Sequence, residues 1–93
     1  VIMTRTWASE LGQDGINVNA IAPGPIVTDM FTAVIPEESD KARALAASIP
    51  VKRLGQADDI ARATSFFIDP ENSFVTGQTL YVCGGTSLGS ITL

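Results

Sequence analysis

The sequence predicts an α/β fold, of which these 93 residues form the edge portion of a parallel sheet. Two short apolar runs, 16–22 and 78–82, have the length and composition of strands, and a segment with helical periodicity lies between them. A strand–helix–strand order at this spacing is typical of a parallel crossover. Because two strands alone do not make a stable sheet, further strands are expected outside this chain.

The composition favours a buried core and excludes several classes of function. Hydrophobic residues make up 45% of the chain, and its net charge is −4 with scattered basic residues, which argues against a nucleic-acid or anionic-membrane surface. The basic side chains, Lys52 and Arg53 included, are expected to be solvated. No run is long enough to span a membrane, and one cysteine without histidine excludes the usual zinc sites. A cytoplasmic location is expected, because the N-terminus lacks the features of a signal peptide.

The first two elements follow from apolar spacing. Met3, Trp7 and Leu11 recur at helical intervals, which predicts the C-terminal part of a helix over 1–12 whose beginning is missing. The run 16–22 alternates but is partly apolar on both faces, as in a strand that is covered on both sides.

The stretch "APGPIVTDM" (22–30) forms a corner after that strand. Gly24 permits a turn or a close approach, and the flanking prolines stiffen the path. Ile26 retains a free N–H and C=O, and Thr28 offers a hydroxyl that can also cap a following turn. Two interpretations are open: a plain strand exit with a helix cap, or a site for a planar amide and a neighbouring phosphate.

Two helical segments and a strand complete the chain. Residues 29–50 form a helical excursion with a helix beginning at Pro36, and their length is typical of a lid. The next helix, within 51–70, has two aspartates in its first turn. Cys83, after the strand 78–82, is expected to be a small buried thiol. The buried stripe of the second helix is expected to comprise Ile60, Ala63, Thr64, Phe67 and Ile68.

The stretches "LGQDGINVNAIAPGPIVTDM" and "IPVKRLGQADDIARATSFFIDPENSFVTGQTLYVCGG" resemble the C-terminal part of the short-chain dehydrogenase/reductase family, with several motifs in order from about Thr4 to Gly85. The resemblance implies a doubly wound, Rossmann-type parallel sheet. Residues 1–93 would be the C-terminal part of a single NAD(P)-binding domain whose N-terminal part is missing. This part would hold the last two strands, the helix between them and the substrate lid, 29–50.

The resemblance also implies a cofactor, NAD or NADP, at the corner. Ile26 would bind the nicotinamide carboxamide through its backbone, and Thr28 would contact the carboxamide or the pyrophosphate. Pro23, Gly24 and Pro25 would form the wall behind the ring. The lid residues Met30, Phe31, Val34 and Ile35 are candidates for lining an apolar substrate pocket, or they pack the lid on the body.

The implied reaction interconverts a secondary alcohol and a ketone by hydride transfer. The catalytic Ser, Tyr and Lys of the family would precede this chain, so the chain alone is expected to be inactive. A homo-oligomer, tetramer or dimer, is implied through the second helix and the last strand. Two alternatives are open: a truncated, non-catalytic interaction module that joins another subunit, and, less favoured, an enoyl-thioester reductase.

Overall fold

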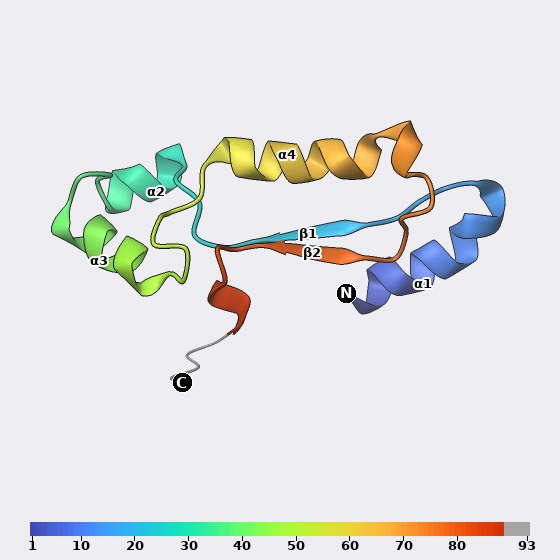
Figure 1. Cartoon of the computed structure of the whole chain (residues 1–93), viewed down its shortest axis with the longest axis horizontal. Helices are drawn as coiled ribbons and strands as arrows, with labels where there is room; N and C mark the ends of the chain where they lie inside the picture. The colour runs from blue at the N-terminus through green and yellow to red at the C-terminus, as the bar shows by residue number, and fades with distance from the viewer. Residues whose placement is uncertain (89–93) are drawn as a thin grey trace.

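A computed structural model describes residues 1–88 of the chain. Two strands lie at its centre, and helices lie over one face and at both ends (Figure 1). In chain order, the α-helices and strands are α1 Ile2–Leu11, β1 Ala20–Pro23, α2 Asp29–Val34, α3 Asp40–Ser48, α4 Ala57–Ile68 and β2 Thr79–Val82. Short 3-10 helices lie at Gly12–Asp14, Pro70–Asn72 and Thr86–Leu88.

The sheet confirms the predicted α/β fold and its parallel crossover. β1 and β2 are parallel neighbours, with Ala20 opposite Thr79 and Pro23 opposite Val82. α4 connects them and packs against both strands. Figure 1 shows α1 near the starts of the strands, whereas α2 and α3 lie at their carboxyl ends. α2 and α3 therefore lie at the end of the sheet where open α/β folds bind ligands.

β1 begins later than the sequence predicted. The prediction of a strand over 16–22 was wrong at both ends, since the strand is Ala20–Pro23. Before it, side chains supply most of the bonds between the two segments: Asn17 Nδ2 and Asn19 Nδ2 donate to backbone carbonyls within 73–75, at 2.9 and 3.0 Å, beside one backbone bond from Gly77 N–H to the Val18 carbonyl. Amide side chains that bond to backbone groups compete in this way with regular strand pairing.

Residues 29–50, predicted to be a lid, contain two short helices, and the second helix starts four residues after the predicted position. Pro36 does not begin α3; the helix begins at Asp40, and Ser39 Oγ accepts a hydrogen bond from Ala42 N–H at 3.2 Å. Ser39 satisfies an otherwise free amide of the first turn, which Pro36 lacks the side chain to do.

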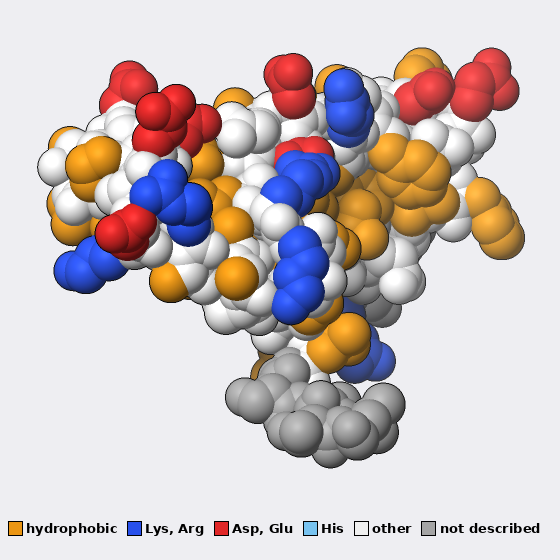
Figure 2. Space-filling view, turned by 60° about the vertical axis from the view of Figure 1, so that its left-hand side comes forward, with side chains coloured by type: hydrophobic (Ala, Val, Ile, Leu, Met, Phe, Trp, Pro, Cys, Tyr) orange, Lys and Arg blue, Asp and Glu red, His pale blue; other side chains and the backbone are white. Residues whose placement is uncertain are grey.

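Residues 1–88 do not enclose a hydrophobic core of their own. The buried apolar residues are Ala8, Ala42, Ile49 and Ala63. Figure 2 shows hydrophobic side chains on the surface among charged ones. The radius of gyration is 16.1 Å, whereas a compact domain of this length has about 12 Å.

Two helices expose apolar side chains. Met3 and Trp7 of α1 are exposed, and so are Thr64 and Ile68 of α4. Within residues 1–88, no element covers these side chains. Of the stripe predicted for α4, Ala63 is buried and Ile60 and Phe67 are half-buried, so the prediction was wrong for Thr64 and Ile68. None of the helices in this part of the chain is long and apolar enough to cross a membrane.

Candidate functional site

The corner after β1 is fixed by a close approach between the ends of the two strands. Gly24 N–H donates to the Val82 carbonyl at 2.9 Å, which extends the ladder by one bond. A Cβ atom at position 24 would lie 2.7 Å from Cys83 Cα and 3.1 Å from its carbonyl oxygen. Because these are backbone atoms, only glycine fits between Pro23 and Pro25 without displacing a strand.

The next residue of the corner, Ile26, faces Gly55 in an isolated parallel bridge. Gly55 N–H donates to the Pro25 carbonyl, and Val27 N–H donates to the Gly55 carbonyl, both at 2.8 Å. Both the N–H and the C=O of Gly55 are thus hydrogen-bonded to the residues that flank Ile26, Pro25 and Val27. The N–H and C=O of Ile26 point away from Gly55, and neither has a hydrogen-bond partner among residues 1–88. An adjacent donor and acceptor are therefore free to bind an amide.

Thr28 caps the helix that follows. Its Oγ1 accepts a hydrogen bond from Phe31 N–H at 3.1 Å, as expected for the N-cap of α2. A hydroxyl that accepts one hydrogen bond still has its own proton to donate. Both interpretations of Thr28 are therefore compatible: it caps a helix, and it has a donor left for a ligand.

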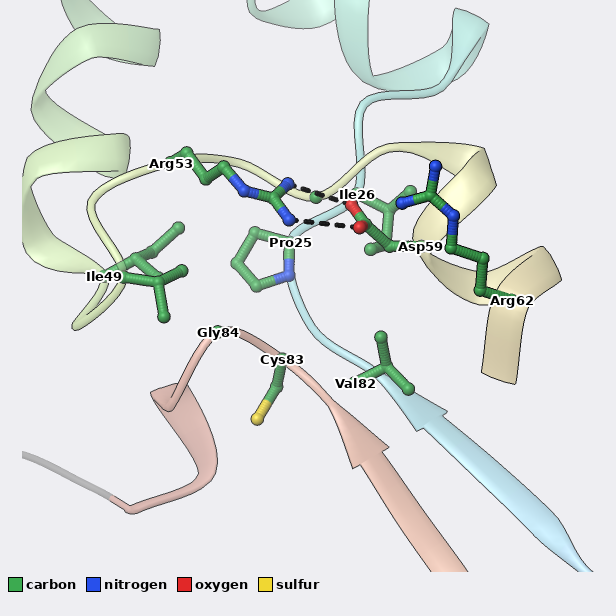
Figure 3. Close-up of a pocket in the computed structure, with 11 residues that line it drawn as sticks. Pro25, Ile26, Ile49, Arg53, Asp59, Arg62, Val82, Cys83 and Gly84 are labelled. Carbon is green, nitrogen blue, oxygen red and sulfur yellow. Dashed lines mark hydrogen bonds and ion pairs between the residues drawn. The ribbon is translucent and has the colours of Figure 1, made fainter. Parts of the chain in front are cut away.

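A hollow of about 270 Å³ lies beside the corner (Figure 3). Of the predicted site residues, only Pro25 and Ile26 line it, and the others lie outside. The walls come from the corner, from residues 49–55 between α3 and α4, from α4 itself and from the end of β2. They comprise Pro25, Ile26, Ile49, Val51, Arg53, Gly55, Asp59, Arg62, Val82, Cys83 and Gly84.

The four predicted substrate residues separate into two pairs on α2 and its end. Met30 and Val34 are 84% and 79% exposed, whereas Phe31 and Ile35 are half-buried. Each pair is four residues apart, so one pair faces outward and the other inward. None of the four lines the hollow.

An ion pair that the sequence analysis missed lies at the hollow. The Arg53 guanidinium donates to both carboxylate oxygens of Asp59, at 2.9 and 3.0 Å (Figure 3). Arg53 is therefore not a merely solvated basic side chain. Its hydrogen bonds, followed by one from Gln56 N–H, hold the pKa of Asp59 well below the usual range. The sequence contains a cation before Gly55 and an acid in the first turn of α4. The two meet only because the chain changes direction between them.

Cys83 is half-buried at the hollow, not fully buried as predicted. Its Sγ lies 3.2 Å from Ser87 Oγ. Hydrogen bonding by the Ser87 side chain, and then by the backbone groups of Ser87 and Gly85, lowers the pKa of this thiol to about 7. The residue is therefore a partly accessible thiol that is partly ionised near neutral pH.

Comparison with known proteins identifies the family. The family model described as enoyl-(acyl carrier protein) reductase matches residues 1–87. The (2S)-[(R)-hydroxy(phenyl)methyl]succinyl-CoA dehydrogenase subunit BbsD of Thauera aromatica is 49% identical over 86 residues, which cover 92% of this chain and 34% of that protein. The chain belongs to the short-chain dehydrogenase/reductase family.

Solved structures of dehydrogenase/reductase proteins have the same fold. A short-chain dehydrogenase/reductase family protein has a TM-score of 0.77 at 39% identity, over 94% of this chain and 34% of that one. ElxO with NADP bound has a TM-score of 0.83 at 30% identity, over 92% of this chain and 35% of its own. The chain thus spans about a third of the length of these relatives, and its fold is part of a Rossmann-type sheet.

Proposed function

We propose that the protein containing this chain is an NAD(P)-dependent oxidoreductase that interconverts a secondary alcohol and a ketone. The observation that carries the proposal is the free N–H and C=O of Ile26, at the carboxyl end of β1. Family membership and the NADP bound to ElxO support a dinucleotide as the ligand. Bound there, the dinucleotide would supply the hydride chemistry.

The residues of the corner would hold and orient this ligand. Ile26 N–H would donate to the carboxamide oxygen, and the Ile26 carbonyl would accept from the carboxamide nitrogen. Thr28 would donate its hydroxyl proton to the carboxamide or a phosphate while it caps α2. Pro23, Gly24 and Pro25 would form a rigid wall behind the ring, because the prolines fix φ and Gly24 is held against Cys83.

The lid helices would cover the substrate. Phe31 and Ile35 would pack the lid on the body, and Met30 and Val34 would contact an apolar substrate when the lid closes over the site. The catalytic acid–base group would lie in the part of the protein outside this chain, and the 93 residues alone would be inactive. Assembly as a homodimer or homotetramer is part of the proposal.

The test is titration of the purified full-length protein with NADH and NADPH, followed by steady-state assays on secondary alcohols and ketones. Saturable binding of one dinucleotide with alcohol-dependent reduction of its oxidised form would support the proposal. Binding of neither, together with stable association with another subunit, would favour the non-catalytic module instead.

A second candidate, an enoyl-thioester reductase, is favoured by one observation. The family model that matches residues 1–87 has that description, whereas the relative from Thauera aromatica is a (2S)-[(R)-hydroxy(phenyl)methyl]succinyl-CoA dehydrogenase subunit. Assay of an enoyl thioester beside the corresponding 3-oxoacyl thioester separates the two reactions, because only the second yields an alcohol.

A further inference from the structure

The Ile26–Gly55 bridge depends on a loop that has few other attachments near the corner. Between the lid and α4, the chain returns through residues 51–56. The two hydrogen bonds of Gly55, at 2.8 Å each, are the backbone bonds that attach this return to the corner. The orientation of Ile26 N–H and C=O thus depends on how firmly Gly55 is held.

Arg53 and Asp59 hold the return from both sides of Gly55. Arg53 precedes it by two residues, and Asp59 follows it by four, in the first turn of α4. The guanidinium–carboxylate contact is bidentate, which fixes direction as well as distance. Asp59 Oδ2 also accepts from Gln56 N–H at 2.7 Å. One carboxylate therefore ties Arg53, two residues before Gly55, and Gln56, the residue after it, to α4.

The partial shielding of Asp59 favours a defined geometry. Its side chain is 19% exposed, whereas that of Arg53 is 60% exposed. In contrast, both partners of the Arg43–Asp40 pair on α3 are largely exposed, at 65% and 98%. Arg53 and Asp59 also line the hollow beside Pro25 and Ile26, so the pair lies directly behind the corner (Figure 3).

We infer that Arg53 and Asp59 are positioning residues for the cofactor: their ion pair clamps Gly55 against the corner and thereby orients the free N–H and C=O of Ile26. The inference rests on the proposed function, since it assigns the pair a part in holding the nicotinamide. The pair does not touch the ligand in this account; it acts through Gly55.

Arg53→Gln is the main test variant, because it removes the clamp and leaves the hydrogen bond between Asp59 and Gln56 in place. In the full-length protein, the Kd of NAD(P)H is expected to rise five- to tenfold, with kcat at saturating cofactor within twofold of the wild-type value. Arg53→Lys, which keeps the charge but loses the bidentate geometry, should recover part of the affinity. The matched control is Arg43→Gln, which breaks the exposed pair on α3 and should leave Kd unchanged.

Amide hydrogen exchange tests the clamp without any cofactor. In Arg53→Gln, exchange at Val27 and Gly55 should accelerate at least tenfold, whereas Gly24, bonded to Val82, should keep its protection. Unchanged exchange at Val27 and Gly55 overturns the inference, whatever the cofactor affinity. Faster exchange with an unchanged Kd in a protein that binds NAD(P)H also overturns it, because the clamp would then have no effect on the ligand. A wild-type protein that binds neither dinucleotide removes the proposed function and, with it, the positioning role.

Discussion

Ile26 and Gly55 face each other in a parallel bridge whose two hydrogen bonds join Gly55 to Pro25 and Val27, the residues that flank Ile26. The consequence is that the backbone groups of Ile26 remain free at the carboxyl end of β1. A side-chain substitution cannot remove these backbone groups. Informative variants therefore change the residues that hold the corner in place.

Gly24→Ala should lower the free energy of unfolding by about 1–3 kcal/mol, the usual cost of inserting a methyl group into a packed contact. The new Cβ would overlap Cys83 Cα at 2.7 Å, so the ends of β1 and β2 must move apart. Denaturant unfolding measures the change. Gly12→Ala is the control, since a Cβ there meets no atom within 4 Å. Equal effects of the two variants would contradict the close approach at Gly24.

Thr28→Ala should lower stability by about 1 kcal/mol through the lost cap and should also weaken cofactor binding. Ser39→Ala provides a matched control, because Ser39 caps α3 with the same kind of bond, to Ala42 N–H. Thermal unfolding and a cofactor titration are measured on both variants. If both weaken the cofactor equally, Thr28 acts only as a helix cap.

Asp59 makes stability depend on acid pH. Because its pKa in the folded chain is depressed below the ordinary value of 3.8, its contribution is present above that value and is lost as the pH falls through the folded pKa. Asp59→Asn should therefore flatten the decline of the free energy of unfolding below about pH 4, while lowering stability at pH 7. Salt should reduce the difference at pH 7. Parallel pH curves for variant and wild type would show that Asp59 does not carry this dependence.

Cys83 should be alkylated with a pH midpoint of about 7. Once the thiol is deprotonated, the Ser87 hydroxyl can donate to Sγ across the same contact and stabilise the thiolate, so Ser87→Ala should move the midpoint to higher pH. Peptide-resolved mass spectrometry after brief iodoacetamide treatment across pH 5–10 measures both midpoints. A wild-type midpoint that does not move in Ser87→Ala would exclude this cause.

The sequence predicted the elements of the fold because their signals are local. Apolar periodicity is sufficient for α4 and β2, and the order of elements implied the parallel pairing of β1 and β2. The predicted starts of β1 and α3 were wrong because side-chain hydrogen bonds decide them: Asn17 and Asn19 donate to backbone carbonyls, and Ser39 accepts from Ala42 N–H. The helix and strand propensities of individual residues do not account for such long-range or capping contacts.

The candidate site was only partly predictable for a similar reason. The cap by Thr28 follows from neighbouring residues, whereas the free groups of Ile26 also depend on the bridge to Gly55. The Arg53–Asp59 pair and the half-buried Cys83 depend on how the return from the lid folds back, which composition and spacing do not encode.

The central claim is that the Ile26 backbone binds the carboxamide of the cofactor. It is tested most directly by comparing the Kd of the preferred dinucleotide with that of its 3-acetylpyridine analogue, which keeps the carbonyl oxygen but has no amide N–H. Loss of one hydrogen bond, worth about 1 kcal/mol, predicts about a fivefold weaker Kd for the analogue. An equal Kd for the two ligands would contradict the role of the Ile26 carbonyl as an acceptor for the carboxamide.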